Sequence, residues 1–224
     1  MMMKRILINI IIIIVIIGLM VGVIFISGYL EELKKINVEE CQIPKWSIGD
    51  TWVYRDPAET YDKNYPYYMR VEVINQTEES YTTRLFNPNS QGFFDYEVID
   101  RDTFLPIKGC VGKKCYEKHY SFLSGKLWPL EIGKTVIINT TERYRILSWT
   151  TETYTETYKV TGKKKINVLA GTFEAYKIEY KIKHNSSSYS KILWYSPRVK
   201  NYIRIESPPG SVFMELFSYS LADK

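Results

Sequence analysis

The feature that most constrains this chain is a long apolar run close to its N-terminus. Residues 6–26 are apolar or glycine except for Asn9, and they follow the positively charged pair Lys4 and Arg5. A helix of about 20 residues reaches roughly 30 Å, the thickness of the hydrocarbon core of a bilayer. The run therefore predicts a transmembrane signal-anchor helix over residues 6–28, and a single-pass membrane protein.

The charges on either side of the run predict its orientation. Lys4 and Arg5 precede it, whereas Glu31 and Glu32 come first after it. Positively charged flanks stay in the cytoplasm, so the remainder of the chain is expected outside it. The predicted organisation is a cytoplasmic N-terminus (1–5), a membrane anchor (6–28), a stalk (29–45) and an extracytoplasmic β domain (46–224).

A cleaved signal peptide is the alternative to this anchor. Its apolar region is usually about 7–15 residues and ends at a site with small residues. The run here is longer, and the nearest such site, Ile26-Ser27-Gly28, has Ile where a small residue is needed. We therefore favour the uncleaved anchor.

Composition narrows the class of the large domain. The chain has 19 tyrosines among its 224 residues and a formal net charge of +5, of which Lys4 and Arg5 supply two charges. The remaining bases are interspersed with acids rather than gathered on one segment, so we expect no nucleic acid partner. The abundance of Ile, Lys and Glu resembles a thermophilic composition.

Short alternating runs separated by Gly, Pro and Asn predict an all-β domain with antiparallel strands. The clearest run is residues 173–183, in which Tyr, Ile, Tyr and Ile alternate with Lys and Glu. The T-E-T-Y repeat of residues 151–158 is polar on both faces, so we expect an edge strand there. An I-G-x-T sequence precedes a predicted strand twice, at 48–51 and 132–135, which indicates either two related halves or one turn type used twice.

The C-terminal third carries a more specific pattern. Ala170-Gly171-Thr172-Phe173, then Trp194-Tyr195-Ser196-Pro197, then Val199 with Arg204 and Glu206 resemble a group of exported half-barrel proteins. These are similar in fold to the periplasmic lipoprotein carriers and receptors of the LolA/LolB type. The resemblance covers mainly residues 168–206, and the Trp46-x-x-Gly49-Asp50-x-Trp52-x-Tyr54 segment also fits. It implies one strongly curved antiparallel sheet, an open or half barrel, whose concave face holds an apolar ligand.

The three cysteines allow two interpretations. Cys110 and Cys115 flank a short loop with Gly112, and in an oxidising compartment they are expected to form a disulfide. The alternative is a zinc site formed by Cys41, Cys110, Cys115 and His119. We favour the disulfide, and expect neither a metal nor another cofactor.

Aromatic side chains are the candidates for binding a ligand on the concave face, although plain core packing would also use them. The candidates are Trp52, Tyr54, Tyr176, Tyr180, Trp194, Phe213 and Phe217. No serine lies in a nucleophile-elbow sequence and no glycine-rich phosphate loop occurs. We therefore expect a membrane-anchored binding module for a lipid or another apolar ligand. The alternatives are a structural or interaction protein with an envelope protein partner and, last, an extracytoplasmic enzyme with a metal site.

Overall fold

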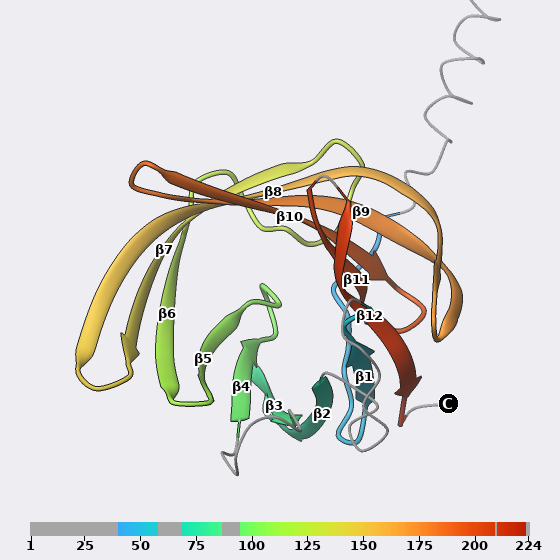
Figure 1. Cartoon of the computed structure of the whole chain (residues 1–224), viewed down its shortest axis with the longest axis horizontal. Coiled ribbons are helices and arrows are strands. Elements are labelled where there is room, and N and C mark those ends of the chain that lie inside the picture. Colours follow the sequence, from blue (N-terminus) through green and yellow to red (C-terminus); the bar gives the residue numbers. More distant parts are fainter. Residues whose placement is uncertain (1–39, 58–68, 87–94, 209, 223–224) are drawn as a thin grey trace, which may run out of the picture. The chain divides into compact units, whose positions relative to one another are not determined.

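The computed structural model describes residues 40–57, 69–86, 95–208 and 210–222. Within these ranges the fold is entirely β, with twelve strands (Figure 1). They are β1 (Thr51–Arg55), β2 (Met69–Gln76), β3 (Ser80–Phe86), β4 (Asp95–Asp100), β5 (Pro106–Val111), β6 (Lys114–Phe122), β7 (Thr135–Arg145), β8 (Trp149–Val168), β9 (Gly171–His184), β10 (Ser187–Ser196), β11 (Asn201–Ser207) and β12 (Ser211–Ser220). The predicted segments 1–5 and 6–28 and most of the stalk lie outside the described residues. The part that is described contains no helix long and apolar enough to cross a membrane.

The strands form one closed antiparallel barrel, so the predicted open or half barrel is wrong. Each strand pairs with its sequence neighbours, and β1 also pairs with β12, from Thr51 opposite Ser220 to Arg55 opposite Glu215. The error has a physical cause. Inward and outward side chains alternate in the same way in an open sheet and in a barrel, so alternation alone does not reveal the closing pair.

The T-E-T-Y segment was predicted to be an edge strand, and this too is wrong. It lies in β8, which pairs with β7 from Trp149 to Lys159 and with β9 from Thr155 onward. Glu156 and Tyr158 are buried. The segment is polar because this side of the barrel interior is polar, not because it lies at the margin of a sheet.

The β5–β6 hairpin contains the predicted disulfide. Cys110 and Cys115 are register partners and are covalently bonded, with their Cα atoms 4.0 Å apart. The turn between the strands starts at Gly112, whose φ of +61° suits glycine at the first central position of a two-residue hairpin turn.

The core consists of two packed clusters that meet at the partly buried Phe104 and Ile205. The first contains Trp46, Trp52, Tyr54 and Tyr81 together with the end of the β8–β9 hairpin around Phe173. The second contains Trp128, Tyr158, Tyr176, Ile178 and Tyr195. Each cluster buries large aromatic side chains, which contribute most of the apolar area removed from water.

The two I-G-x-T sequences form the same turn. Gly49 and Gly133 both have a φ of +94°. Gly49 N donates to Val73 O and Val73 N donates to Asp50 O, at 2.8 and 2.9 Å. Gly133 N and Val160 N make the equivalent bonds, also at 2.8 and 2.9 Å, to Val160 O and Lys134 O. The same turn therefore starts β1 and β7, six strands apart in the barrel.

The absence of a side chain at Gly109 of β5 is required by close packing. A Cβ there would lie 2.5 Å from the backbone oxygen of Tyr96 and 3.1 Å from the hydroxyl of Tyr116. We predict that Gly109→Ala lowers the free energy of unfolding by about 1–3 kcal/mol, as overpacking does elsewhere. Urea denaturation of the purified chain would measure it. Gly162→Ala in β8 is the matched control, because nothing lies within 4 Å of its added methyl group. Equal stability of the two variants would contradict the prediction.

Candidate ligand-binding site

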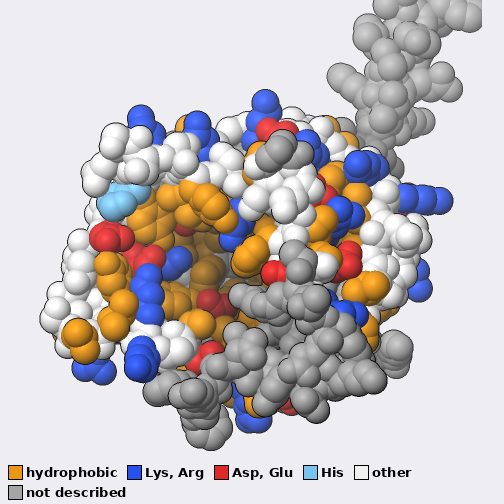
Figure 2. Space-filling view, in the orientation of Figure 1, with side chains coloured by type: hydrophobic (Ala, Val, Ile, Leu, Met, Phe, Trp, Pro, Cys, Tyr) orange, Lys and Arg blue, Asp and Glu red, His pale blue; other side chains and the backbone are white. Residues whose placement is uncertain are grey.

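The candidate site is the interior of the barrel. Figure 2 shows the molecule hollowed on one face, over the strands labelled β5 to β8 in Figure 1, with hydrophobic, basic and acidic side chains around the hollow. The interior has two chemically different sides. Strands β1–β4 supply mainly apolar side chains, whereas β6–β8 supply tyrosines, carboxylates and lysines.

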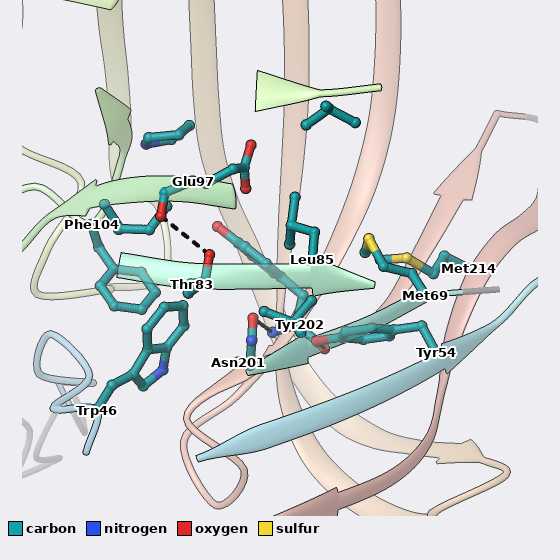
Figure 3. A pocket seen from close by; sticks show the side chains of 14 residues that line it. Trp46, Tyr54, Met69, Thr83, Leu85, Glu97, Phe104, Asn201, Tyr202 and Met214 are labelled. Carbon is teal, nitrogen blue, oxygen red and sulfur yellow. Dashed lines mark hydrogen bonds between the residues drawn. The ribbon is translucent and has the colours of Figure 1, made fainter. Parts of the chain in front are cut away.

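On the apolar side there is a cavity of about 400 Å³. Figure 3 shows how Trp46, Tyr54, Met69, Leu85 and Met214 lie around it. The full lining is Trp46, Tyr54, Met69, Val71, Thr83, Leu85, Glu97, Ile99, Phe104, Pro106, Val111, Asn201, Tyr202 and Met214. The volume lies in the range of small-molecule sites, and the scarcity of polar groups in the lining suits an apolar occupant.

Hydrogen bonds to the backbone fix two of the aromatic side chains of this cavity. Tyr54 of β1 donates its hydroxyl to Tyr202 O of β11 at 3.0 Å. Trp46 Nε1 donates to Lys200 O at 2.8 Å, and its ring contacts Phe104 edge-on at 4.5 Å between centroids. With their polar ends satisfied, these residues present apolar ring surface to the cavity.

On the polar side, phenol hydroxyls donate to carboxylates, in three cases on a neighbouring strand and in one case on the same strand. Each strand places every second residue inward, so Glu152, Tyr154, Glu156 and Tyr158 of β8 share the inner face. Hydrogen bonds run from Tyr154 to Glu142 (2.8 Å), from Tyr144 to Glu152 (2.9 Å), from Tyr180 to Glu156 (3.0 Å) and from Tyr158 to Glu156 (3.2 Å).

Two lysines of β6 neutralise one of these carboxylates. Lys114 Nζ lies 2.5 Å from Glu142 Oε1, and Lys118 Nζ lies 3.7 Å from Glu142 Oε2. The same ammonium groups lie over aromatic rings: Lys114 over Tyr144 at 4.2 Å, and Lys118 over Tyr116 at 5.3 Å. On the inner face of β6 and β7, lysine ammonium groups therefore contact both a carboxylate and aromatic rings.

The environment holds the tyrosines in their neutral form. Burial, followed by the charge of nearby carboxylates, raises the pKa of Tyr116, Tyr154 and Tyr180 far above the ordinary value. Burial also raises the pKa of Tyr202, to about 12. The phenols therefore serve as hydrogen-bond donors at physiological pH, and not as bases or nucleophiles.

The pKa of Glu142 is shifted the other way. Burial acts to raise it, but the hydrogen bond from Lys114, the charge of Lys118 and the hydrogen bond from Tyr154 together hold the pKa below its ordinary value. Glu142 is therefore ionised and locked between β6 and β8.

Tyr116 and Tyr120 of β6 connect the two sides. Tyr116 donates its hydroxyl to Glu97, and Tyr120 donates to the backbone oxygen of Pro106. Glu97 and Pro106 both line the apolar cavity. The polar cluster and the cavity are therefore adjacent parts of one interior.

The structure separates the aromatic candidates named from sequence. Tyr54 lines the cavity, Tyr180 belongs to the polar cluster, and Trp52 and Tyr176 are buried in the core. Trp194 is buried beside a smaller pocket of about 310 Å³ that three lysines also line. Phe213 and Phe217 are 41% and 38% exposed and do not line the cavity.

The alternative zinc ligands are not brought together. Cys110 and Cys115 are bonded to each other, which leaves no thiolate at either position for a metal. Cys41 is buried where its backbone pairs with Leu130, and His119 is exposed on β6. Within the described residues there is no group of three or more His, Cys, Asp or Glu suited to a metal ion.

Apart from Tyr180, the residues of the polar cluster were not among the candidates named from sequence, although the signal is present. Acidic and aromatic residues alternate at every second position in β8, and Lys114, Tyr116, Lys118 and Tyr120 do the same in β6. Polar alternation of this kind on adjacent strands indicates a polar barrel interior.

No protein-family model matches the chain, and no curated protein sequence matches it. Among the solved structures that match the chain are three exported or lipoprotein-type proteins. The hypothetical lipoprotein YmcC of Escherichia coli K12 has a TM-score of 0.47 at 8% identity, covering 80% of this chain and 90% of that one. A predicted lipoprotein of Parabacteroides distasonis has a TM-score of 0.43 at 12% identity, covering 81% and 100%. A predicted exported protein of Bacteroides fragilis with a YmcC-like fold has a TM-score of 0.40 at 10% identity, covering 81% and 99%. None of the three is described as a carrier or receptor of the LolA/LolB type.

The lowered pKa of Glu142 makes a prediction about stability. A group with a depressed folded-state pKa stabilises the fold above its unfolded-state pKa, here about 4.5, and this contribution is lost as the pH falls through the folded-state value. We predict that Glu142→Gln lowers the free energy of unfolding at neutral pH and that the difference from the parent chain shrinks in acid. Denaturation curves between neutral and acidic pH would measure this. Glu117→Gln, at an exposed site on the same hairpin, is the control. A difference that grew towards low pH would contradict the assignment.

Proposed function

We propose that this chain is a membrane-anchored, extracytoplasmic binding module whose barrel holds the apolar part of a ligand. The observation that carries the proposal is the cavity of about 400 Å³ inside a closed barrel, with tyrosine, tryptophan, methionine and aliphatic side chains in its lining. A mostly apolar lining of this size gains free energy when an apolar guest displaces water from it.

Two features of the chain support the extracytoplasmic part of the proposal. The Cys110–Cys115 disulfide is typical of an oxidising compartment. The apolar segment 6–28, with Lys4 and Arg5 before it, provides the anchor and the orientation. A tethered module of this kind presents or retains its ligand near the membrane instead of carrying it away.

The anchoring can be tested by fractionation. We predict that the full chain sediments with membranes, resists alkaline extraction, and is degraded by protease added outside intact cells or spheroplasts. Two lysines within the apolar run, Ile13→Lys with Ile17→Lys, should reduce membrane recovery, because each costs roughly 2.5–3.5 kcal/mol at the centre of a span. A β domain degraded only after lysis, or a full chain recovered in the cytosol, would overturn the proposed location.

The binding role can be tested by filling the cavity. Leu85 points into it from β3, whereas the next residue, Phe86, is exposed. We predict that the full chain in lipid nanodiscs binds n-hexanol by calorimetry, against nanodiscs without protein. We further predict that Leu85→Trp weakens this binding because the larger indole takes up part of the cavity.

Phe86→Trp is the matched control and should bind as the parent chain does. Thermal unfolding of both variants would establish that they fold. Binding that Leu85→Trp leaves intact, or no binding by the parent chain, would contradict the proposal.

A further inference from the structure

Glu156, at the centre of the polar cluster, is a buried carboxylate without a basic partner in the described part of the chain. Its residue is 3% exposed. Its oxygens accept hydrogen bonds from Tyr180 at 3.0 Å and Tyr158 at 3.2 Å, and no lysine, arginine or histidine of the described residues forms an ion pair with it. Glu142, by contrast, has two lysines. A buried carboxylate is normally paired, so Glu156 is the exception to explain.

Tyrosine rings surround this carboxylate. Tyr158 and Tyr180 have their ring centroids 4.7 Å apart and both donate to it. Tyr154 lies two residues before Glu156 on the same inner face of β8, and Tyr120 of β6 and Tyr154 are both register partners of Thr140 on β7. A carboxylate within several electron-rich rings is the arrangement that recognises ammonium groups, through charge and through cation–π attraction.

A second, independent observation lies on the neighbouring strand. Thr140 of β7 is fully buried, and its Oγ1 has no hydrogen-bond partner in the described structure. Thr140 is the register partner of Tyr154 and of Tyr120. Glu156 lies two residues beyond Tyr154, so it is the diagonal neighbour of Thr140 on the same inner face. A buried hydroxyl without a partner indicates that a donor or acceptor belongs beside it.

The charges of the inner face select the kind of guest. The inward carboxylates of the cluster are Glu97, Glu142, Glu152 and Glu156, against the two lysines Lys114 and Lys118. This excess of negative charge would repel an anionic guest. A protonated amine instead supplies donors for Glu156 and Thr140 and a positive charge for the rings.

We propose that Glu156 and Thr140, with the tyrosines around them, form a binding site for an ammonium group. The inference rests on the proposed function, because the apolar part of the same ligand occupies the cavity. Tyr120 connects the two regions through its hydrogen bond to Pro106, which lines the cavity. The ligand class is therefore a cationic amphiphile with a primary or quaternary amine at one end.

The test compares three water-soluble probes with the same chain: n-hexylammonium, n-hexanol and hexanoate. Each is titrated by calorimetry against the full chain in nanodiscs, with protein-free nanodiscs as the blank. We expect n-hexylammonium to bind about ten-fold or more tightly than n-hexanol, and hexanoate to bind most weakly, since one charge-assisted hydrogen bond supplies at least that factor.

Glu156→Gln keeps the shape of the side chain and removes its charge. It should bring n-hexylammonium to the affinity of n-hexanol while leaving n-hexanol binding unchanged, and the latter also reports that the variant folds. Thr140→Val should weaken n-hexylammonium several-fold. Glu117→Gln is the control, because Glu117 is exposed on β6 and does not belong to the polar cluster, and it should change neither affinity.

The outcomes separate the two proposals. Equal affinity for n-hexylammonium and n-hexanol, or a preference that Glu156→Gln does not remove, overturns the ammonium site and leaves the apolar binding role intact. Failure of all three probes to bind overturns both. Tightest binding of hexanoate overturns the charge assignment.

Discussion

Asp50 and the strand pairing beside it hold the barrel closed, and every other feature of the interior depends on this closure. The Asp50 side chain is fully buried at the start of β1. Its oxygens accept from Ser47 N at 3.0 Å and from Ala222 N, just past β12, at 2.7 Å. Lys200, in the turn before β11, lies 4.0 Å from it. The Asp50 carboxylate thus links the start of β1 to the end of β12. Without this link, only the pairing of the short strand β1 with β12 would hold the two ends of the barrel together.

Closure explains why the interior can hold such different chemistry on its two sides. In an open sheet the carboxylates of β7 and β8 could face water, and they would need few partners. Inside a closed wall they must be satisfied by neighbours, and the phenols of β7, β8 and β9 do this. A tyrosine supplies one donor and a large apolar ring, so it can line a cavity and satisfy a carboxylate at once.

The sequence predicted local structure well and the closed topology poorly. The alternation in residues 173–183 predicted β9, and the two I-G-x-T sequences correctly preceded strands, β1 and β7. The Cys110–Cys115 spacing predicted the disulfide, because a bond over so few residues depends on local geometry alone. The lengths of β5 and β6 beyond this loop were not predicted, since Gly109 and the charged residues of β6 weaken the apolar alternation.

The candidate site was harder to predict, for a related reason. Tyr54 and Tyr180 were named and lie at the cavity and at the polar cluster, but Phe213 and Phe217 face the exposed side of β12. The β-bulge that shifts the β1–β12 register after Val53 changes which residues face inward, and nothing in the local sequence marks it. The polar residues were not predicted because the interior was assumed to be apolar, and a strand with two polar faces was therefore assigned to an edge.

The two-sided interior is built on a backbone that uses the same I-G-x-T turn twice. The turns at Gly49 and Gly133 have the same φ and the same backbone hydrogen bonds, and each starts a strand that pairs with the next one along the chain. Strand pairing depends on the backbone and not on the inward side chains, so the inner face can change its chemistry along the wall. The apolar cavity is lined from β1–β5, β11 and β12, whereas the polar cluster lies on β6–β9. The closed barrel therefore has an apolar and a polar wall facing one interior, which is the arrangement that an amphiphilic ligand requires.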